Sequence, residues 1–136
     1  MKTVNAKYPV INANSVNYLE YFCILDIPTD EAVITGSSLL VALGRLPKNN
    51  DLDLVVSQRV FNRLTPKSYP NETYTIDGKI EIGTKFMGWN VHHILKDAIK
   101  IDGYNFISIN KLLAFYKILN RHADKFKIDV LKTLRN

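Results

Sequence analysis

The chain has 136 residues, of which 46% are hydrophobic, and its net charge is +5. This length and composition predict a single domain spanning residues 1–136 with one core, and they exclude a fibrous repeat. A single cysteine, Cys23, excludes a disulfide framework, and no apolar run is long enough for a membrane span, so we expect a cytoplasmic protein with no membrane partner and a mild attraction to polyanions.

Helices and strands are expected to alternate in the first half of the chain. Hydrophobic spacing and capping residues predict helices over 14–26, 39–43 and 57–64 and strands over 32–35 and 51–56. The first helix would end before Pro28 and carry Cys23 on its apolar face. Gly36-Ser37 separates the first strand from the second helix, and Ser57 would cap the third helix.

Two Asp-Gly dipeptides, Asp77-Gly78 and Asp102-Gly103, mark hairpins in the second half, because a tight hairpin turn needs positive φ at both central positions. The paired strands would be 72–76 with 79–84 and 99–101 with 104–107. Helices are expected over 91–98, 108–119 and 124–134. This order predicts an α+β fold in which a mixed β-sheet carries helices packed mainly on one side.

One short stretch carries residues suited to nucleotide chemistry. Gly36 permits a sharp turn, and the amide groups that begin the next helix point outward, so a phosphate can dock there beside the Ser37 hydroxyl. Asp51 and Asp53 are two residues apart on a strand, so both carboxylates project from one face and can share a hard cation. Magnesium carrying a triphosphate would neutralise their repulsion.

Two segments of the chain resemble the polymerase-β-like nucleotidyltransferase superfamily. VITGSSLLVALGRLPKNNDLDLVV has the core pattern, and GYNFISINKLLAFYKILNR is similar to a late strand, Ser-capped helix and Lys/Arg element of that superfamily. Within it, the chain looks most like small minimal nucleotidyltransferases and the lincosamide-type enzymes. The resemblance implies a nucleotidyltransferase-like fold and transfer of a nucleoside monophosphate from a triphosphate such as ATP to an acceptor hydroxyl, with release of pyrophosphate.

The same resemblance implies roles for individual residues. Gly36 and Ser37 would bind the triphosphate, and Asp51 and Asp53 would be catalytic and bind Mg²⁺, with up to two ions that clamp the attacking and leaving oxygens. A third carboxylate on a neighbouring strand would act as base or second-metal ligand. Glu81 is the candidate, because isoleucines flank it on both sides and would turn it away from the core. The alternative for Glu81 is an ordinary charged residue on the wet face of a hairpin.

Basic residues late in the chain are a further candidate for nucleotide binding. Lys117, Arg121 and Lys125 have the spacing of one helical stripe, although a break near His122 would disrupt it. The resemblance implies that Lys117 and Arg121 contact the triphosphate or the acceptor. A solvated helix face is the alternative.

Histidine and aromatic residues in the middle of the chain give weaker signals. His92 and His93 are adjacent, so on a helix they diverge and cannot jointly chelate one metal, and we expect them to be structural or surface residues. Trp89 with Met87 and Phe86 could form a base-stacking platform, although aromatics near a hairpin are more often the edge of a core.

Three functions remain open on the sequence. The first is a metal-dependent nucleotidyltransferase, whose acceptor could be a small molecule, RNA or protein and whose pocket a homodimer could complete. The second is a catalytically inactive nucleotidyltransferase-fold protein with a binding or antitoxin-like role, which gains if Glu81 lies far from the aspartates. The third is a small basic nucleic-acid-binding protein.

Overall fold

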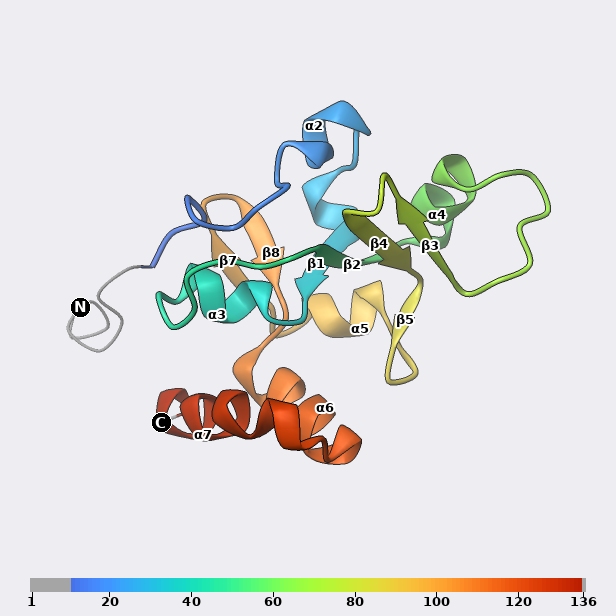
Figure 1. Ribbon diagram of the computed structural model, residues 1–136. Coiled ribbons are helices and arrows are strands. Elements are labelled where there is room, and N and C mark those ends of the chain that lie inside the picture. The colour runs from blue at the N-terminus through green and yellow to red at the C-terminus, as the bar shows by residue number, and fades with distance from the viewer. Residues whose placement is uncertain (1–10, 136) are drawn as a thin grey trace.

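A mixed β-sheet forms the centre of the structure (Figure 1). The computed structural model describes residues 11–135, and within this range the sheet has six strands in the order β3-β4-β2-β1-β8-β7. The strands are β1 (Ala32–Thr35), β2 (Leu52–Val56), β3 (Thr73–Ile76), β4 (Ile80–Gly83), β7 (Ile99–Ile101) and β8 (Tyr104–Phe106). β1 runs antiparallel to β2 and parallel to β8, and β2 runs parallel to β4. The predicted α+β class with a mixed sheet is therefore confirmed.

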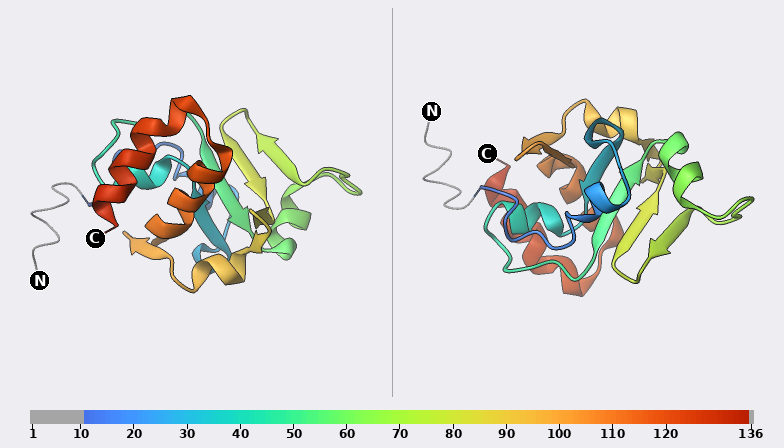
Figure 2. Two further views of the ribbon diagram at one scale, coloured as in Figure 1. Left: turned by 90° about the horizontal axis from the view of Figure 1, so that it is seen from below. Right: turned by 90° about the horizontal axis from the view of Figure 1, so that it is seen from above.

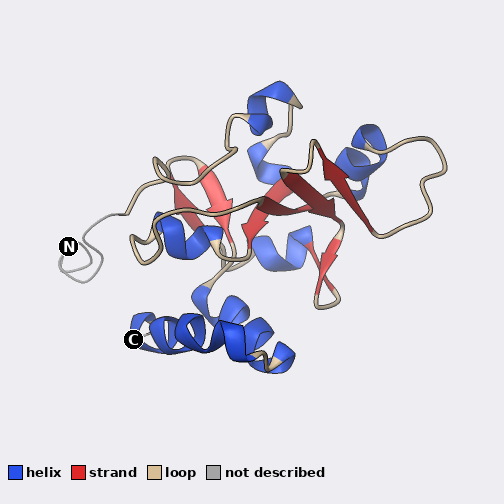
Figure 3. Cartoon of the chain, in the orientation of Figure 1, coloured by secondary structure: helices blue, strands red, loops and turns tan. Residues whose placement is uncertain are grey.

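Helices cover the two faces of the sheet unequally. The α-helices of the described range are α2 (Tyr21–Ile24), α3 (Ser38–Ala42), α4 (Gln58–Leu64), α5 (Val91–Leu95), α6 (Ile109–Leu119) and α7 (Lys125–Leu134), and the 3-10 helices are η1 (Thr29–Glu31) and η2 (His122–Asp124). In Figures 1 and 2, α3, α5 and α6 lie below the sheet and α7 lies beyond α6, whereas α2 lies above it. Figure 3 shows the same layers coloured by secondary structure.

The core lies between the sheet and the helices below it. All four residues of β1 are buried, as expected for a central strand. α6 buries Leu112, Leu113 and Tyr116, because residues at this spacing share one face of a helix. None of the helices formed by residues 11–135 combines the length and the apolar character needed to cross a membrane.

The first helix is much shorter than the sequence predicts. Helix is expected over 14–26, but α2 begins only at Tyr21, after a series of turns. Tyr18 has a φ of 75°, which interrupts a right-handed helix. Cys23 is exposed while its neighbour Phe22 is buried, so the prediction that Cys23 lies on the apolar face is wrong.

Both Asp-Gly hairpins are confirmed by their pairing and by positive φ at each central residue of Asp77-Gly78 and Asp102-Gly103. The sequence did not indicate a third hairpin, in which β5 (Lys85–Phe86) pairs with β6 (Trp89–Asn90). Its turn is Met87-Gly88, and Met87 adopts a φ of 55° without the Asn or Asp that marks such turns. α5 follows directly and ends at Leu95, earlier than the predicted residue 98.

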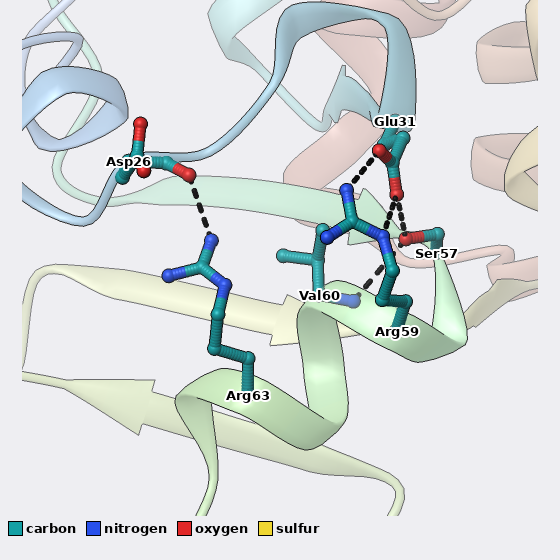
Figure 4. A network of polar contacts seen from close by, with 6 residues as sticks. All are labelled: Asp26, Glu31, Ser57, Arg59, Val60 and Arg63. Carbon is teal, nitrogen blue, oxygen red and sulfur yellow. Dashed lines mark hydrogen bonds and ion pairs between the residues drawn. The ribbon is translucent and has the colours of Figure 1, made fainter.

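A polar network fastens α4 to the beginning of β1 (Figure 4). Glu31 forms an ion pair with Arg59 and accepts a hydrogen bond of 2.7 Å from the hydroxyl of Ser57, the residue that caps α4. Arg63 on the same helix donates to the main-chain oxygen of Asp26. These contacts lie near the amino end of β1 and stabilise the packing of α4 there. The candidate site lies at the carboxyl end of β1.

Candidate active site

The turn after β1 brings its backbone against a carboxylate. Gly36 has a φ of +73°, in the left-handed region that favours glycine. A Cβ added to Gly36 would lie only 2.9 Å from Oδ2 of Asp53. Both the conformation and the available space therefore require glycine here, and a larger residue would displace the carboxylate.

Three neighbouring strands place polar side chains in one row. Thr35 of β1 lies in register with Asp53 of β2, and Asp53 lies in register with Glu81 of β4. Residues in register point to the same face, and neighbouring strands are only about 4.8 Å apart. Ile80 and Ile82 are buried, which turns Glu81 toward the opposite face, as the alternation in the sequence predicts. The structure therefore brings Glu81 beside Asp53.

Asp53 is in an unfavourable environment for a charged group. Its pKa is raised from an ordinary value of 3.8 to about 7, first by burial, then by the negative charges of Asp51 and Glu81 and by a side-chain hydrogen bond with Glu81. Its Oδ1 atom is buried and has no hydrogen-bond partner among residues 11–135. Buried polar atoms are normally satisfied, so an orphaned carboxylate oxygen of this kind is typical of a ligand or cation site.

A cavity of about 310 Å³ lies over this face of the sheet. Its acidic part contains Gly36, Asp53 and Glu81, and its apolar part contains Phe86 and Met87 of the β5–β6 hairpin and Phe115 of α6. A wider hollow of about 460 Å³ lies under the loop 65–72, but its lining includes neither Asp53 nor Glu81. The smaller cavity is therefore the candidate site, because its lining contains Asp53, the carboxylate whose pKa is raised, together with Glu81.

Two predicted site residues, Asp51 and Ser37, do not line this cavity. Asp51 is exposed and precedes β2 rather than belonging to it, so the two aspartates are not presented by one strand as the sequence predicts. The charge of Asp51 nevertheless contributes to the raised pKa of Asp53, which places it nearby. Ser37 is half-buried next to Gly36, and its hydroxyl makes no capping hydrogen bond to α3.

Asn49 fixes the loop that leads to Asp51. Its side chain is only 2% exposed and donates hydrogen bonds to the main-chain oxygens of Asn17, at 3.2 Å, and of Asp51, at 2.9 Å. It also accepts from the amide of Asn17 at 2.7 Å, while the Asn17 side chain donates to the main-chain oxygen of Asn49 at 2.9 Å. The position of Asp51 therefore depends on a reciprocal contact with the amino-terminal segment.

The expected basic stripe is not formed. α6 ends at Leu119, and Asn120 adopts a left-handed conformation that turns the chain, so Lys117 and Arg121 do not share one helix. Lys117 is exposed on the last turn of α6 and does not line the cavity. Arg121 and Lys125 instead border a separate hollow of about 450 Å³ between the end of α6 and α7.

Arg121 belongs to an ion-pair cluster that the sequence did not indicate. Asp124 is 2% exposed and is paired with Arg121 at 2.6 Å and with Lys127 at 3.7 Å. The ammonium group of Lys127 lies 5.4 Å from the centre of the Tyr116 ring, and the pKa of Tyr116 is raised to about 12 first by burial and then by Asp124, with a smaller contribution from Asp53. Both ion pairs join residues three positions apart, so the cluster is local in sequence.

The donor set of the cavity suits a hard cation. Among residues 11–135, no group of three or more His, Cys, Asp or Glu side chains is arranged to hold a metal ion, and both His92 and His93 are exposed, as predicted. Mg²⁺, however, is usually bound by one or two carboxylates together with water and substrate phosphates. Asp53, with its orphaned oxygen, and Glu81 beside it fit that requirement.

Comparison of the chain with protein-family models, with curated proteins and with solved structures found no match in any of the three.

Proposed function

We propose that this protein is a metal-dependent nucleotidyltransferase of the polymerase-β-like type, which transfers a nucleoside monophosphate from a triphosphate such as ATP to an acceptor hydroxyl. The observation that carries the proposal is the register of Asp53 with Glu81 beside the Gly36 turn. The sequence resemblance implies nucleotide chemistry at Gly36 and Asp53, with Glu81 as the third carboxylate, and these three residues line one cavity. Ser37 and Asp51 of the same motif do not line it.

The reaction requires one bond to form and one to break. The acceptor oxygen bonds to the α-phosphorus of the donor, the bond from that phosphorus to the bridging oxygen breaks, and pyrophosphate leaves with the electron pair. The acceptor proton passes to a carboxylate, for which Glu81 is suited, because it lies next to Asp53 in the cavity and is exposed. Positioning and charge neutralisation supply the acceleration, as in other phosphoryl transfers.

Asp53 and Glu81 would hold the magnesium ion, with Asp51 close enough to contribute through charge. When bound, Mg²⁺ neutralises the phosphate oxygens and lowers the cost of the negative charge that develops during transfer. The side chains of the protein prepare this role, since Asp51 and Glu81 place negative charge near Asp53, whose Oδ1 atom has no hydrogen-bond partner among residues 11–135. Gly36 keeps the adjacent backbone close enough for its turn to border the donor phosphates.

An active enzyme accounts for the carboxylates better than an inactive scaffold. A protein that kept only the fold would gain stability by replacing Asp53 with a neutral residue, because burial and like charges both oppose its ionised form. The inactive alternative gains if Glu81 lies far from the aspartates, and Glu81 lies in register with Asp53. The proximity of the two acids therefore favours catalysis.

The test uses the full chain with α-labelled nucleoside triphosphates, Mg²⁺ and cell extract as the source of acceptors. We expect a labelled product that disappears in Asp53→Asn and persists in Asp30→Asn, a matched change of an exposed aspartate at the other end of β1. Binding of an ATP analogue with Mg²⁺ is measured in parallel by calorimetry. A chain that neither binds the analogue nor labels any product is not a nucleotidyltransferase, and an interaction role would replace the proposal.

A further inference from the structure

The apolar part of the cavity is an aromatic wall, which we define as Phe86, Met87 and Phe115. The rings of Phe86 and Phe115 have centroids 4.4 Å apart and an interplanar angle of 45°. All three side chains line the same cavity as Asp53 and Glu81. A ligand that occupies this cavity therefore meets carboxylates on one side and an apolar surface with π faces on the other.

The aromatic wall is held in place from behind. Trp89, on the second strand of the β5–β6 hairpin, stacks on His93 with ring centroids 5.8 Å apart and lies under the ammonium group of Lys111 at 5.5 Å. Lys111 in turn pairs with Asp97 at 2.6 Å. The hairpin is thus braced against α5 and α6, so the wall exists before a ligand binds, and little ordering cost opposes binding.

The position of the wall indicates which reactant it faces. The Gly36 turn follows β1, Glu81 belongs to β4, and Asp53 lies between them in register. The β5–β6 hairpin follows β4, and β4 lies on the other side of β2 from β1, so the hairpin and the Gly36 turn lie on different sides of Asp53. In an in-line displacement the attacking oxygen enters opposite the leaving group. If the donor phosphates lie at Gly36, pyrophosphate leaves on that side and the acceptor enters from the side of Glu81 and the wall.

We infer that the aromatic wall binds the acceptor, and that the acceptor is a molecule with a planar apolar ring next to its reactive hydroxyl. This inference rests on the proposed function. The ring packs against Phe86 and Phe115, while the charged groups of the cavity, Asp53, Glu81 and Lys85, are left to the polar parts of the reactants. The acceptor oxygen bonds to the α-phosphorus, pyrophosphate departs, and the hydroxyl proton passes to Glu81.

Equilibrium binding separates the two reactants. The donor probe is α,β-methylene-ATP with Mg²⁺, which cannot be cleaved at the relevant bond. The acceptor probes are tyramine, which carries a ring, a hydroxyl and an ammonium group, and ethanolamine, which carries the same two polar groups without the ring. We expect tyramine to bind the wild-type chain about tenfold more tightly than ethanolamine, both with and without saturating donor analogue.

Three variants locate the site. Phe115→Ala removes one ring of the tilted Phe86–Phe115 pair. Met87→Gly removes a wall side chain at a φ of 55°, where glycine is the better residue, so this variant will fold. Both are expected to weaken tyramine binding about tenfold and to leave the affinity for the donor analogue within about twofold. Phe126→Ala is the control, because Phe126 is 59% exposed and lies outside the cavity.

Each contrary result is distinct. If the donor analogue displaces tyramine, or if Met87→Gly weakens the analogue and spares tyramine, the wall holds the nucleobase and the inference is wrong. Equal affinities for tyramine and ethanolamine would show that the wall does not bind a ring. The inference would then be wrong, and the proposed function would be unaffected. A wild-type chain that does not bind the donor analogue overturns the proposed function itself, and the acceptor assignment with it.

Discussion

Two regions of this protein contain buried or partly buried aspartates, and they treat the charge in opposite ways. Asp124, between α6 and α7, is paired with Arg121 and Lys127. Asp53, at the centre of the sheet, faces Glu81 and retains a buried oxygen without a hydrogen-bond partner among the described residues. The first arrangement stabilises a helical corner. The second opposes folding, which is what the proposed function requires of a carboxylate that receives a cation.

The largest effect should come from the acidic region. Glu81→Gln keeps the shape of the side chain but removes the group that receives the acceptor proton, so transfer should fall by about 100-fold or more. Transfer is measured with labelled triphosphate and the acceptor identified in extract. Glu72→Gln, a matched change of an exposed glutamate in the loop before β3, should leave the rate unchanged. Equal rates for Glu81→Gln and wild type would remove Glu81 from the mechanism.

The paired region should affect stability instead. Asp124→Asn leaves Arg121 and Lys127 without their common partner and should lower the free energy of unfolding by about 2 kcal/mol. Affinity for the magnesium-bound donor analogue should stay within about twofold of wild type, because this cluster lies outside the cavity. Urea unfolding and calorimetry measure the two quantities. A variant of normal stability that loses donor affinity would assign Asp124 to the binding site.

Stability should depend on pH through Asp53. The folded carboxyl keeps its proton up to about pH 7, whereas the unfolded group releases it near its ordinary pKa of 3.8. The folded state therefore binds more protons in this window, so the contribution of Asp53 to the free energy of unfolding falls as pH rises from about 4 to 7 and is constant above. The pKa difference is worth about 4 kcal/mol at most, and partial solvent exposure reduces our expectation to about 2 kcal/mol.

The comparison of wild type with Asp53→Asn isolates this contribution. The variant has no titrating group at residue 53. In the absence of Mg²⁺, the free energy of unfolding of the variant should therefore increase relative to that of wild type as pH rises from 4 to 7. Added Mg²⁺ should then stabilise wild type more than the variant. A difference that does not change with pH would show that Asp53 ionises normally in the folded protein.

A smaller effect should distinguish the cost of the backbone conformation at Gly36 from the cost of a contact with Asp53. Gly36→Ala combines a positive φ with a Cβ 2.9 Å from Asp53, whereas Gly88→Ala has a φ of +80° and no atom within 4 Å of the added Cβ. Both changes should cost about 1 kcal/mol from the backbone, and Gly36→Ala about 1 kcal/mol more from displacement of the carboxylate. Thermal unfolding measures the difference. Donor affinity should fall for Gly36→Ala alone.

Local signals predicted most of the sheet and the caps. β1 and β2 follow from short apolar runs, and the hydroxyls of Ser57 and Ser108 accept hydrogen bonds from the amides three residues later, as N-caps do. Alternation also turned Glu81 to the correct face. That Glu81 lies beside Asp53 was expected only from the family resemblance and not from the alternation, because the parallel register of β2 and β4 is set by packing rather than by either strand alone.

Sequence patterns gave wrong predictions where contacts with other residues determine the local backbone conformation. Asn17 and Tyr18 interrupt the first predicted helix, because the loop at Asn49 holds that segment through side-chain and main-chain hydrogen bonds. The predicted basic stripe fails for a local reason: Asn120 adopts a left-handed conformation that ends α6, and Arg121 then pairs with Asp124 three residues later. The spacing of hydrophobic or charged residues describes one helix at a time, so it does not reveal the contact or turn that interrupts that helix.

The contact between Asn17 and Asn49 has one more consequence. Because Asn49 also holds the main chain of Asp51, the amino-terminal segment is linked by hydrogen bonds to a residue whose charge acts on Asp53. A change in the segment ahead of Asn17 would therefore reach Asp51, and with it the proposed metal site, through this loop and not through the sheet. A partner that binds the amino-terminal segment would therefore influence the proposed site from a distance.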